Sequence, residues 1–341
     1  MKIVAYAVDE GVKMLLEERS QDAVKIDILN YAFGKLENGI LSVEGLENVR
    51  DLPRLRKMNP NIKIVLSVGG WGAGGFSEMA MSHTSRRRFI KSVPDILERY
   101  DFDGLDVDWE YPGSSIAGIT SSPEDKENFT NLMKELREAL QGKLLSFAAG
   151  VEDFCIENME LAEVQKYVDF VHLMTYDMKG SFTKVTGHHT NLYPAEGDET
   201  KQSVATAVEK FLEQGVSKEK IFIGAAFYGR VWRGVNGDNN GLFQKAETYG
   251  SETISYRELK SKYIEKQGFK KFWDDSAKAP YLFDGNTFIS YDDARSVKEK
   301  MLFAERMKLG GVMFWEYSLD DGELLNTLYE TLRIERKEKG R

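Results

Sequence analysis

The order of apolar runs along this chain limits the folds it can adopt more than any other feature. Short, nearly continuous apolar runs alternate with longer stretches of mixed polarity from one end of the sequence to the other. Continuous apolar runs of this length are typical of parallel strands that are buried on both faces. We therefore predict strands at 2–7, 26–33, 62–69, 102–110, 144–150, 168–176, 221–227 and 311–317.

Helical patterns occupy the intervals between these runs. The clearest lies at 124–141, where apolar residues recur at spacings of three, four and seven. Further helices are predicted at 85–100, 201–214 and 293–308. Pro94 falls inside the helix predicted at 85–100. We expect a kink or an early end there because proline removes a backbone donor.

Alternating strands and helices predict a parallel α/β fold. Eight such units favour a (β/α)8 TIM barrel over an open doubly wound sheet, and no G-x-G-x-x-G follows the first strand. The interval 231–310 is too long for one barrel helix. We predict a small α+β insertion subdomain at 231–291, between the seventh strand and the last barrel helix, within one catalytic domain spanning 1–341.

The amino-acid composition limits which binding partners, metal sites and cellular compartments are plausible for this protein. The formal net charge of −9 does not suit a nucleic-acid backbone, so no nucleic-acid partner is expected. Cys155 is the single cysteine, which excludes an intrachain disulfide and a cysteine-based metal site. The opening apolar run meets Asp9 too early for a signal peptide or a membrane span. We expect a monomer without metal or cofactor, either cytoplasmic or secreted with its leader removed.

The run at 103–112 places three carboxyl groups on one face of a strand. Side chains alternate along a strand, so Asp106, Asp108 and Glu110 share a face and the apolar residues between them share the other. Adjacent carboxyl groups inside a barrel cannot all be charged cheaply, so one pKa should be raised and a proton shared. Glu110 lies at the carboxyl end of the strand, where barrel active sites form, and is our candidate general acid.

Two other interpretations of this run are a solvent-facing acidic strand and a divalent-metal site of the Asp-x-Asp-x-Glu kind. The apolar flanks disfavour the first, and the absence of a His-x-His motif disfavours the second. Asp108 and Glu110 lie about 6–7 Å apart along the strand, so in a glycoside hydrolase both would approach a bound sugar from the same side. A retaining pair needs a nucleophile opposite the acid, so another strand or the substrate itself must supply that group.

The acidic run resembles the signature of family 18 chitinases, with Asp103, Asp106, Asp108 and Glu110 in the sequence DGLDVDWEYP. Three further motifs follow in the order of that family. They are the S-x-G-G motif in Ser67-Val68-Gly69-Gly70-Trp71, the M-x-Y-D motif in Met174-Thr175-Tyr176-Asp177, and the eighth-strand segment Gly311-Val312-Met313-Phe314-Trp315-Glu316. The resemblance covers nearly the whole chain, and the insertion is similar to the small domain of the deep-cleft subgroup.

The resemblance implies substrate-assisted retention, in which the acetamido oxygen of the sugar attacks its own anomeric carbon. Glu110 would protonate the leaving oxygen and then activate water. Asp108 would hold the acetamido N–H, and Asp106 would share a proton with Asp108. Tyr176 would donate a hydrogen bond to the acetamido oxygen. Asp177 and Trp315 would bind the sugar, with Trp315 as the floor of the site.

Other predicted substrate-binding residues lie at or near strand ends or within the same motifs. Arg230 is a candidate to bind a sugar hydroxyl, with a structural ion pair as the alternative. Tyr6 and Phe33 are candidates for lining the cleft, with packing at the barrel top as the alternative. The remaining candidates of this group are Met174, Tyr111, Gly70, Trp71 and Tyr228.

The leading interpretation is a retaining chitinase that cleaves β-1,4 linkages between N-acetylglucosamine units of chitin or chito-oligosaccharides. A second is an N-acetylglucosaminidase that acts on peptidoglycan or N-glycans. A third, from another functional class, is a catalytically weak chitin-binding lectin on the same barrel. The presence of Glu110 disfavours the lectin, because lectin-like relatives lose the proton donor.

Overall fold

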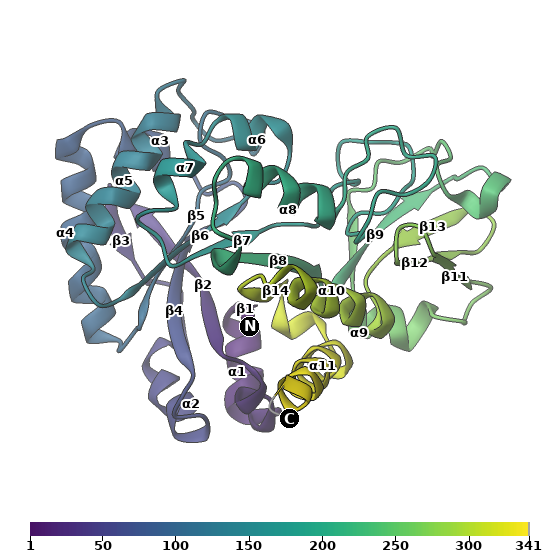
Figure 1. Cartoon of the computed structure of the whole chain (residues 1–341), viewed down its shortest axis with the longest axis horizontal. Helices are drawn as coiled ribbons and strands as arrows, with labels where there is room; N and C mark the ends of the chain where they lie inside the picture. The colour runs from purple at the N-terminus through teal and green to yellow at the C-terminus, as the bar shows by residue number, and fades with distance from the viewer. Residues whose placement is uncertain (340–341) are drawn as a thin grey trace. The chain divides into compact units, whose positions relative to one another are not determined.

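The computed structural model describes residues 1–339 and divides them into two compact units (Figure 1). The first unit comprises Lys2–Leu173 and Phe211–Phe222. The second unit comprises Met1, Met174–Lys210 and the chain from Ile223 onwards. Each unit is described by itself.

The first unit is built on parallel strands that follow one another in the sheet in chain order. β1 pairs with β2, β2 with β4, β4 with β5, β5 with β6 and β6 with β7. A doubly wound sheet would reverse its strand order at a switch point, and no reversal occurs among these strands. Their bounds are β1 (Lys2–Ala7), β2 (Ile28–Glu37), β4 (Lys63–Gly69), β5 (Gly104–Asp108), β6 (Leu144–Ala149) and β7 (Phe170–Leu173).

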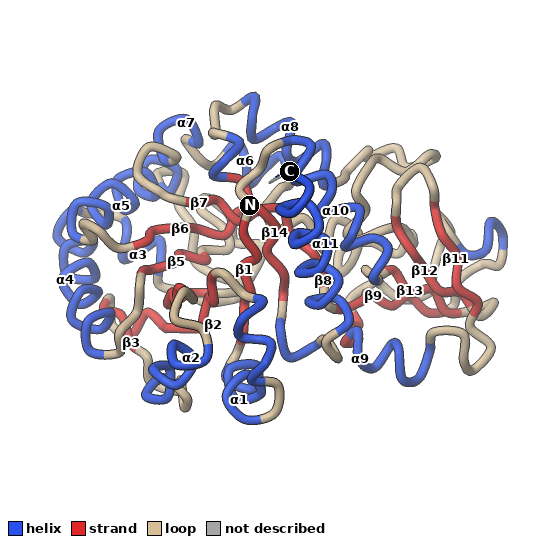
Figure 2. Tube along the Cα trace, turned by 60° about the horizontal axis from the view of Figure 1, so that its bottom comes forward, coloured by secondary structure: helices blue, strands red, loops and turns tan. Residues whose placement is uncertain are grey.

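Helices connect these strands and lie outside them (Figure 2). The helix α4 packs on α5, on α3 and on the short strand β3 (Ile40–Ser42), which pairs antiparallel with β2. The helices between β1 and β7 are α1 (Asp9–Glu17), α2 (Leu52–Met58), α3 (Phe76–Ala80), α4 (His83–Arg99), α5 (Asp125–Ala139), α6 (Asp153–Glu157) and α7 (Leu161–Val164).

The chain then adds α8 (Val204–Glu213), β8 (Ile221–Ala226), α10 (Ala294–Met307), β14 (Gly311–Trp315) and α11 (Glu323–Lys339). This is the strand and helix order of a (β/α)8 barrel, and the predicted fold class is confirmed. Every predicted barrel strand is present: β1 has the predicted bounds, β2 begins later and ends later than its predicted run, and the other strands lie within theirs. The open doubly wound sheet is therefore excluded.

We expected either a kink or an early helix end at Pro94, and the early end is wrong. α4 continues through Pro94 to Arg99. Buried apolar side chains lie on both sides of the proline, with Phe89, Ile90 and Val93 before it and Leu97 after it. Packing of this apolar face outweighs the one backbone hydrogen bond that proline removes.

An antiparallel sheet in the second unit occupies the interval between β8 and α10. Its five strands are arranged in the order β10-β9-β13-β12-β11. Aromatic side chains, including Trp232, Tyr281 and Phe288, form its core. The strands are β9 (Tyr228–Arg233), β10 (Glu252–Ser255), β11 (Lys270–Asp274), β12 (Ala279–Phe283) and β13 (Thr287–Ser290), with the short helix α9 (Tyr256–Glu258) among them. That the whole chain acts as one catalytic domain remains a prediction.

Short helical turns complete the chain. They are η1 (Ser20–Lys25), η2 (Val49–Asp51), η3 (Lys218–Lys220), η4 (Asp238–Gly241), η5 (Leu259–Tyr263) and η6 (Tyr317–Leu319). No helix within residues 1–339 combines the length and the apolar character needed to cross a bilayer.

Candidate active site

Three carboxyl groups lie buried on β5 and directly after it. Asp106 is fully buried, Asp108 is 4% exposed and Glu110 is 9% exposed. The interpretation of the acidic run as a solvent-facing strand is therefore wrong, because both faces of β5 are covered. Between the carboxyl residues, Trp109 is 2% exposed and stacks on Phe76 at 5.5 Å between ring centroids. The two faces of β5 thus divide as the alternation predicted.

Four hydrogen-bonding side chains surround the Asp106 carboxylate. Its Oδ2 accepts hydrogen bonds from the hydroxyls of Tyr6 and Ser67, each at 2.8 Å. Its Oδ1 accepts from Ser146 at 2.6 Å and lies 3.3 Å from Nδ1 of His172. Burial raises the pKa of Asp106, but these contacts more than offset that effect, so its pKa lies below the usual value.

Asp108 has the opposite environment. Its Oδ1 is buried and has no hydrogen-bond partner among the described residues. Burial, together with the negative charges of Glu110 and Asp106, raises the pKa of Asp108 well above its usual value. Two carboxyl groups two residues apart on one strand therefore have pKa values displaced in opposite directions. Such a pair favours one proton held between its members, with Asp108 as its preferred site.

The turn after β4 requires both of its glycines. Gly69 has a φ of +120° and Gly70 a φ of +94°, a region that side chains with a Cβ rarely adopt. A Cβ on Gly69 would lie 2.0 Å from the carbonyl oxygen of Asp108. The Gly70 N–H donates to that same oxygen at 2.9 Å. The S-x-G-G motif thus fixes the backbone of β5 at its acidic end.

Aromatic side chains surround this turn in the first unit. A Cβ on Gly70 would come within 2.7 Å of the ring of Phe33, so the two residues are in close contact. Trp71 is 55% exposed and meets Tyr111 edge to face at 6.3 Å between ring centroids. Burial, followed by the charge of Glu110, raises the pKa of Tyr111. The structure thus brings together the predicted residues Phe33, Gly70, Trp71 and Tyr111.

The second unit holds the other predicted residues. Asp177 receives two short contacts from Arg230, from Nη2 to Oδ2 at 2.5 Å and from Nε to Oδ1 at 2.6 Å. The hydroxyl of Tyr228 donates to the same Oδ1 at 2.8 Å. Burial raises the pKa of Asp177, but hydrogen bonds from His189 and Arg230 hold it well below its usual value. Arg230 therefore forms the ion pair that was the alternative to sugar binding.

The remaining residues of the M-x-Y-D and eighth-strand motifs also lie in this unit. The hydroxyl of Tyr176 lies 3.9 Å from the sulfur of Met313, and its ring meets Tyr228 edge to face. Met174 and Trp315 are half-buried. Trp315 ends β14 and is followed by a cis peptide bond to Glu316.

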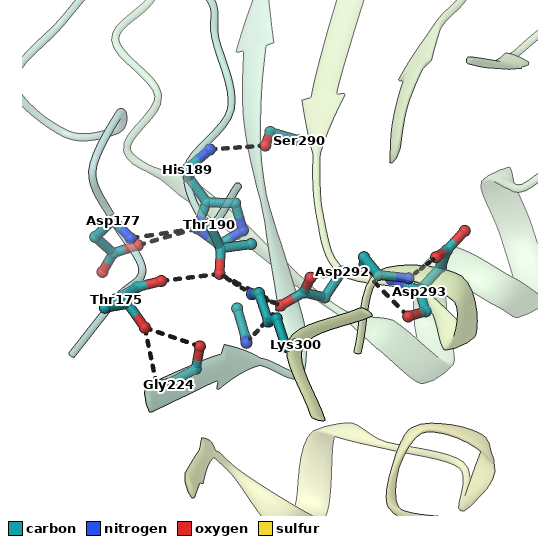
Figure 3. Close-up of polar contacts among 11 residues, drawn as sticks. Thr175, Asp177, His189, Thr190, Gly224, Ser290, Asp292, Asp293 and Lys300 are labelled. Carbon is teal, nitrogen blue, oxygen red and sulfur yellow. Dashed lines mark hydrogen bonds and ion pairs between the residues drawn. The ribbon is translucent and has the colours of Figure 1, made fainter. Parts of the chain in front are cut away.

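A buried polar network fixes the turn that carries Tyr176 and Asp177 (Figure 3). Thr175 exchanges hydrogen bonds with the backbone of Gly224 in β8, and its carbonyl accepts from Thr190. Lys300 on α10 donates to Thr190 at 2.6 Å and pairs with Asp292 at 2.5 Å. Both members of this ion pair are about 1% exposed, so the turn is tied to α10 through fully buried groups.

Residues 2–320 match the family described as glycosyl hydrolases family 18. The chain belongs to this family. Among curated proteins, it is 38% identical to chitinase A1 of Niallia circulans over 303 residues, which cover 82% of this chain and 43% of that protein. It is 32% identical to an endochitinase of Manduca sexta over 295 residues, covering 80% of this chain and 53% of that protein. The family 18 chain thus spans about half the length of these relatives.

Among solved structures, the family 18 chain is similar to an N-acetylglucosaminidase of the same family from Paenibacillus barengoltzii. The TM-score is 0.94 at 44% identity, and the match covers 97% of this chain and 99% of the other. The predicted family and barrel fold are confirmed by these similarities.

Sequence reasoning assigned no role to three polar residues of this family 18 chain, although it quoted Ser67 within the S-x-G-G motif. Ser67, Ser146 and His172 lie on predicted strands and contact Asp106. The available signal was a polar side chain within an otherwise apolar run, in the register that faces the acidic strand. No cluster of three histidine, cysteine, aspartate or glutamate side chains suited to a metal ion occurs within residues 1–339.

Proposed function

We propose that this protein is a retaining glycoside hydrolase that cleaves β-1,4 linkages between N-acetylglucosamine units of chitin or chito-oligosaccharides. The observation that carries the proposal is the pair of buried carboxyl groups of Asp106 and Asp108 on β5, whose pKa values are displaced in opposite directions, with Glu110 directly after the strand. Membership of glycosyl hydrolases family 18 supports the same reaction class. The similar proteins named as chitinases support chitin-type substrates.

Each carboxyl on β5 has a distinct part in the proposed reaction. Glu110 protonates the oxygen of the leaving sugar and then activates a water molecule. Asp108 holds the acetamido N–H of the sugar, so that the acetamido oxygen attacks the anomeric carbon. The bond to the leaving oxygen breaks as the new carbon–oxygen bond forms, and water later opens the oxazolinium-like intermediate with retained configuration. Asp106 carries the fixed negative charge behind Asp108.

The second unit contributes further residues to the proposal. Tyr176 donates a hydrogen bond to the acetamido oxygen, and Trp315 provides an aromatic face for the pyranose ring. Asp177 binds the sugar, and Arg230 and Tyr228 orient its carboxylate through the contacts described above. The proposed state is a monomer without metal or cofactor.

A second candidate is an N-acetylglucosaminidase that releases single sugars. It is favoured by one observation, the similarity to the N-acetylglucosaminidase of Paenibacillus barengoltzii over nearly the full length of both chains. The two candidates share the chemistry and differ in the product, because an exo-acting N-acetylglucosaminidase releases monosaccharide from the chain end.

The test is product analysis from N-acetylchitohexaose, with the anomers resolved at early times. Initial β-anomers of the dimer and longer oligomers support the chitinase, and initial release of monosaccharide supports the N-acetylglucosaminidase. Initial α-anomers contradict substrate assistance, and binding without any cleavage supports the lectin.

Glu110→Gln tests the assigned general acid. The variant keeps the shape of the side chain, but its amide is too weak an acid to protonate the leaving oxygen, so turnover should fall at least about 10²–10⁴-fold while oligosaccharide affinity is retained. The matched control is Glu124→Gln, an exposed glutamate in the segment between β5 and α5 that should leave turnover unchanged. Near-normal turnover in Glu110→Gln contradicts the assignment.

A further inference from the structure

His172 is a fully buried histidine on β7 that has no part in the proposed reaction. Polar atoms from three other strands reach its Nδ1: the hydroxyl of Tyr6 on β1, the amide of Asn30 on β2 and the carboxylate of Asp106 on β5. The ring of Phe222 meets the imidazole edge to face at 5.5 Å. A polar ring in such a place needs a reason, because burying it without hydrogen bonds is unfavourable.

The position of one hydrogen follows from the distances around Nδ1. The Tyr6 hydroxyl has a single hydrogen, which points at Oδ2 of Asp106 at 2.8 Å. Nδ1 of His172 lies 2.9 Å from the oxygen of that hydroxyl and 3.3 Å from Oδ1 of Asp106. A bare Nδ1 would direct its lone pair at a carboxylate and compete for the hydrogen of Tyr6. A hydrogen on Nδ1 makes both contacts attractive.

The other ring nitrogen points to the same tautomer. Nε2 of His172 is buried with no hydrogen-bond partner among the described residues, so a hydrogen on Nε2 would be a buried donor without an acceptor. Nδ1, in contrast, has two oxygen atoms within reach. Asn30 does not decide the tautomer, because its amide lies 3.4 Å from Nδ1 and can present either its nitrogen or its oxygen.

We propose that His172 is a positioning residue that donates from Nδ1 toward Asp106, keeps that carboxyl ionised and so places the proton of the aspartate pair on Asp108. With His172, the Asp106 carboxylate has four donors, the others being Tyr6, Ser67 and Ser146. Within residues 1–339, the buried Oδ1 of Asp108 has no hydrogen-bond partner, so Asp108 is the carboxyl that accepts the proton more readily.

The proposal rests on the proposed function for its consequence in catalysis. Asp108 shares its face of β5 with Glu110, the group that gives up and regains a proton in each cycle. The titratable groups that face His172 and its partner Asp106 are Tyr6 on β1 and Asp108 on β5. Loss of the Nδ1 donor would let Asp106 take up a proton at a higher pH. The active state, in which Asp106 is ionised and Asp108 carries the proton, would then be less populated.

The experiment compares two substitutions at one position. His172→Leu removes the donor, whereas His172→Asn retains an amide nitrogen close to the place of Nδ1. The acid limb of the kcat profile on N-acetylchitohexaose should move up by about one pH unit in His172→Leu, because a donor to a charged group is lost. It should stay near the wild-type position in His172→Asn. An unchanged limb in folded His172→Leu, or equal movement in both variants, overturns the proposal.

A second readout does not depend on turnover. Carbon-13 carboxyl resonances of labelled aspartate report the ionisation of Asp106, which is assigned from its absence in Asp106→Asn. Asp106 should take up its proton at a higher pH in His172→Leu than in the wild type, and identical titrations overturn the proposal even if the protein cleaves no sugar. If His172→Leu does not fold, His172→Gln replaces it, since its longer amide reaches the Nε2 position and supplies no donor at Nδ1.

Discussion

Replacement of Lys300 by methionine tests how strongly the buried network holds the turn that carries Tyr176 and Asp177. Methionine has nearly the length of lysine and lacks the charge, so the variant removes the ammonium group without leaving a large cavity. The Lys300 side chain is fully buried and pairs with Asp292 at 2.5 Å. Breaking such a pair costs about 3–5 kcal/mol, because the partner charge stays buried without compensation.

The remaining contacts of Asp292 set the magnitude within that range. Its carboxylate still accepts hydrogen bonds from the Ala226 N–H at 3.0 Å and the Ser296 hydroxyl at 2.6 Å after the substitution. These donors stabilise part of the negative charge that stays buried on Asp292. We therefore expect a loss at the lower end of that range, about 3 kcal/mol in the free energy of unfolding. Burial lowers the pKa of Lys300 despite the nearby carboxylate, which shows the same balance between desolvation and pairing.

The assay is urea unfolding, followed by tryptophan fluorescence and by far-ultraviolet circular dichroism to check that both signals report one transition. The matched control is the double variant Lys300→Met with Asp292→Asn, which removes both charges. Its new side-chain oxygen can accept from the Ala226 N–H, and its amide nitrogen then faces the Ser296 hydroxyl, which can turn to accept. The double variant should recover at least about 1 kcal/mol relative to Lys300→Met alone. A loss below about 1 kcal/mol in the single variant, or no recovery in the double variant, would refute the reasoning.

Two further predictions concern the β4 turn and a partly buried carboxylate. Gly69→Ala should cost about 2 kcal/mol or more in unfolding free energy and lower turnover, because its Cβ would lie 2.0 Å from the Asp108 carbonyl at a φ of +120°. Gly74→Ala has no heavy atom within 4 Å of the new Cβ and should change stability by less than about 0.5 kcal/mol; similar losses in both would contradict the argument. Burial raises the pKa of Asp274, but its hydrogen bonds, that with His188 first among them, more than offset this effect, so its pKa lies well below the usual value. A carboxyl with a depressed pKa stabilises the fold above its unfolded value near about 4 and loses that effect as the pH falls. The stability difference between wild type and Asp274→Asn, measured by urea unfolding from pH 7 downwards, should therefore shrink below about pH 4; a constant difference would exclude this account.

The sequence by itself determined the fold class and the location of the acidic strand. A parallel strand that is buried on both faces needs apolar side chains at nearly every position, so a continuous apolar run in the sequence identifies it locally. The alternation of Asp106, Val107 and Asp108 likewise follows from strand geometry alone, which assigns their side chains to opposite faces. The positive φ of Gly69 and Gly70 was also foreseeable, since glycine tolerates that conformation best.

Only the tertiary structure decided how the carboxyls differ. Asp106 and Asp108 are the same residue type two positions apart, and nothing in their order says which has the lower pKa. That difference comes from Tyr6, Ser67, Ser146 and His172, which are distant in sequence and meet around Asp106 only after β1, β4, β6 and β7 are arranged about β5.

The continuation of α4 past Pro94 and the pairing of Arg230 with Asp177 were decided in the same way. In each case, packing or electrostatics between distant segments outweighed a local preference or chose between two local alternatives. The sequence shows which side chains are present. The contacts that set their pKa values form only in the folded protein.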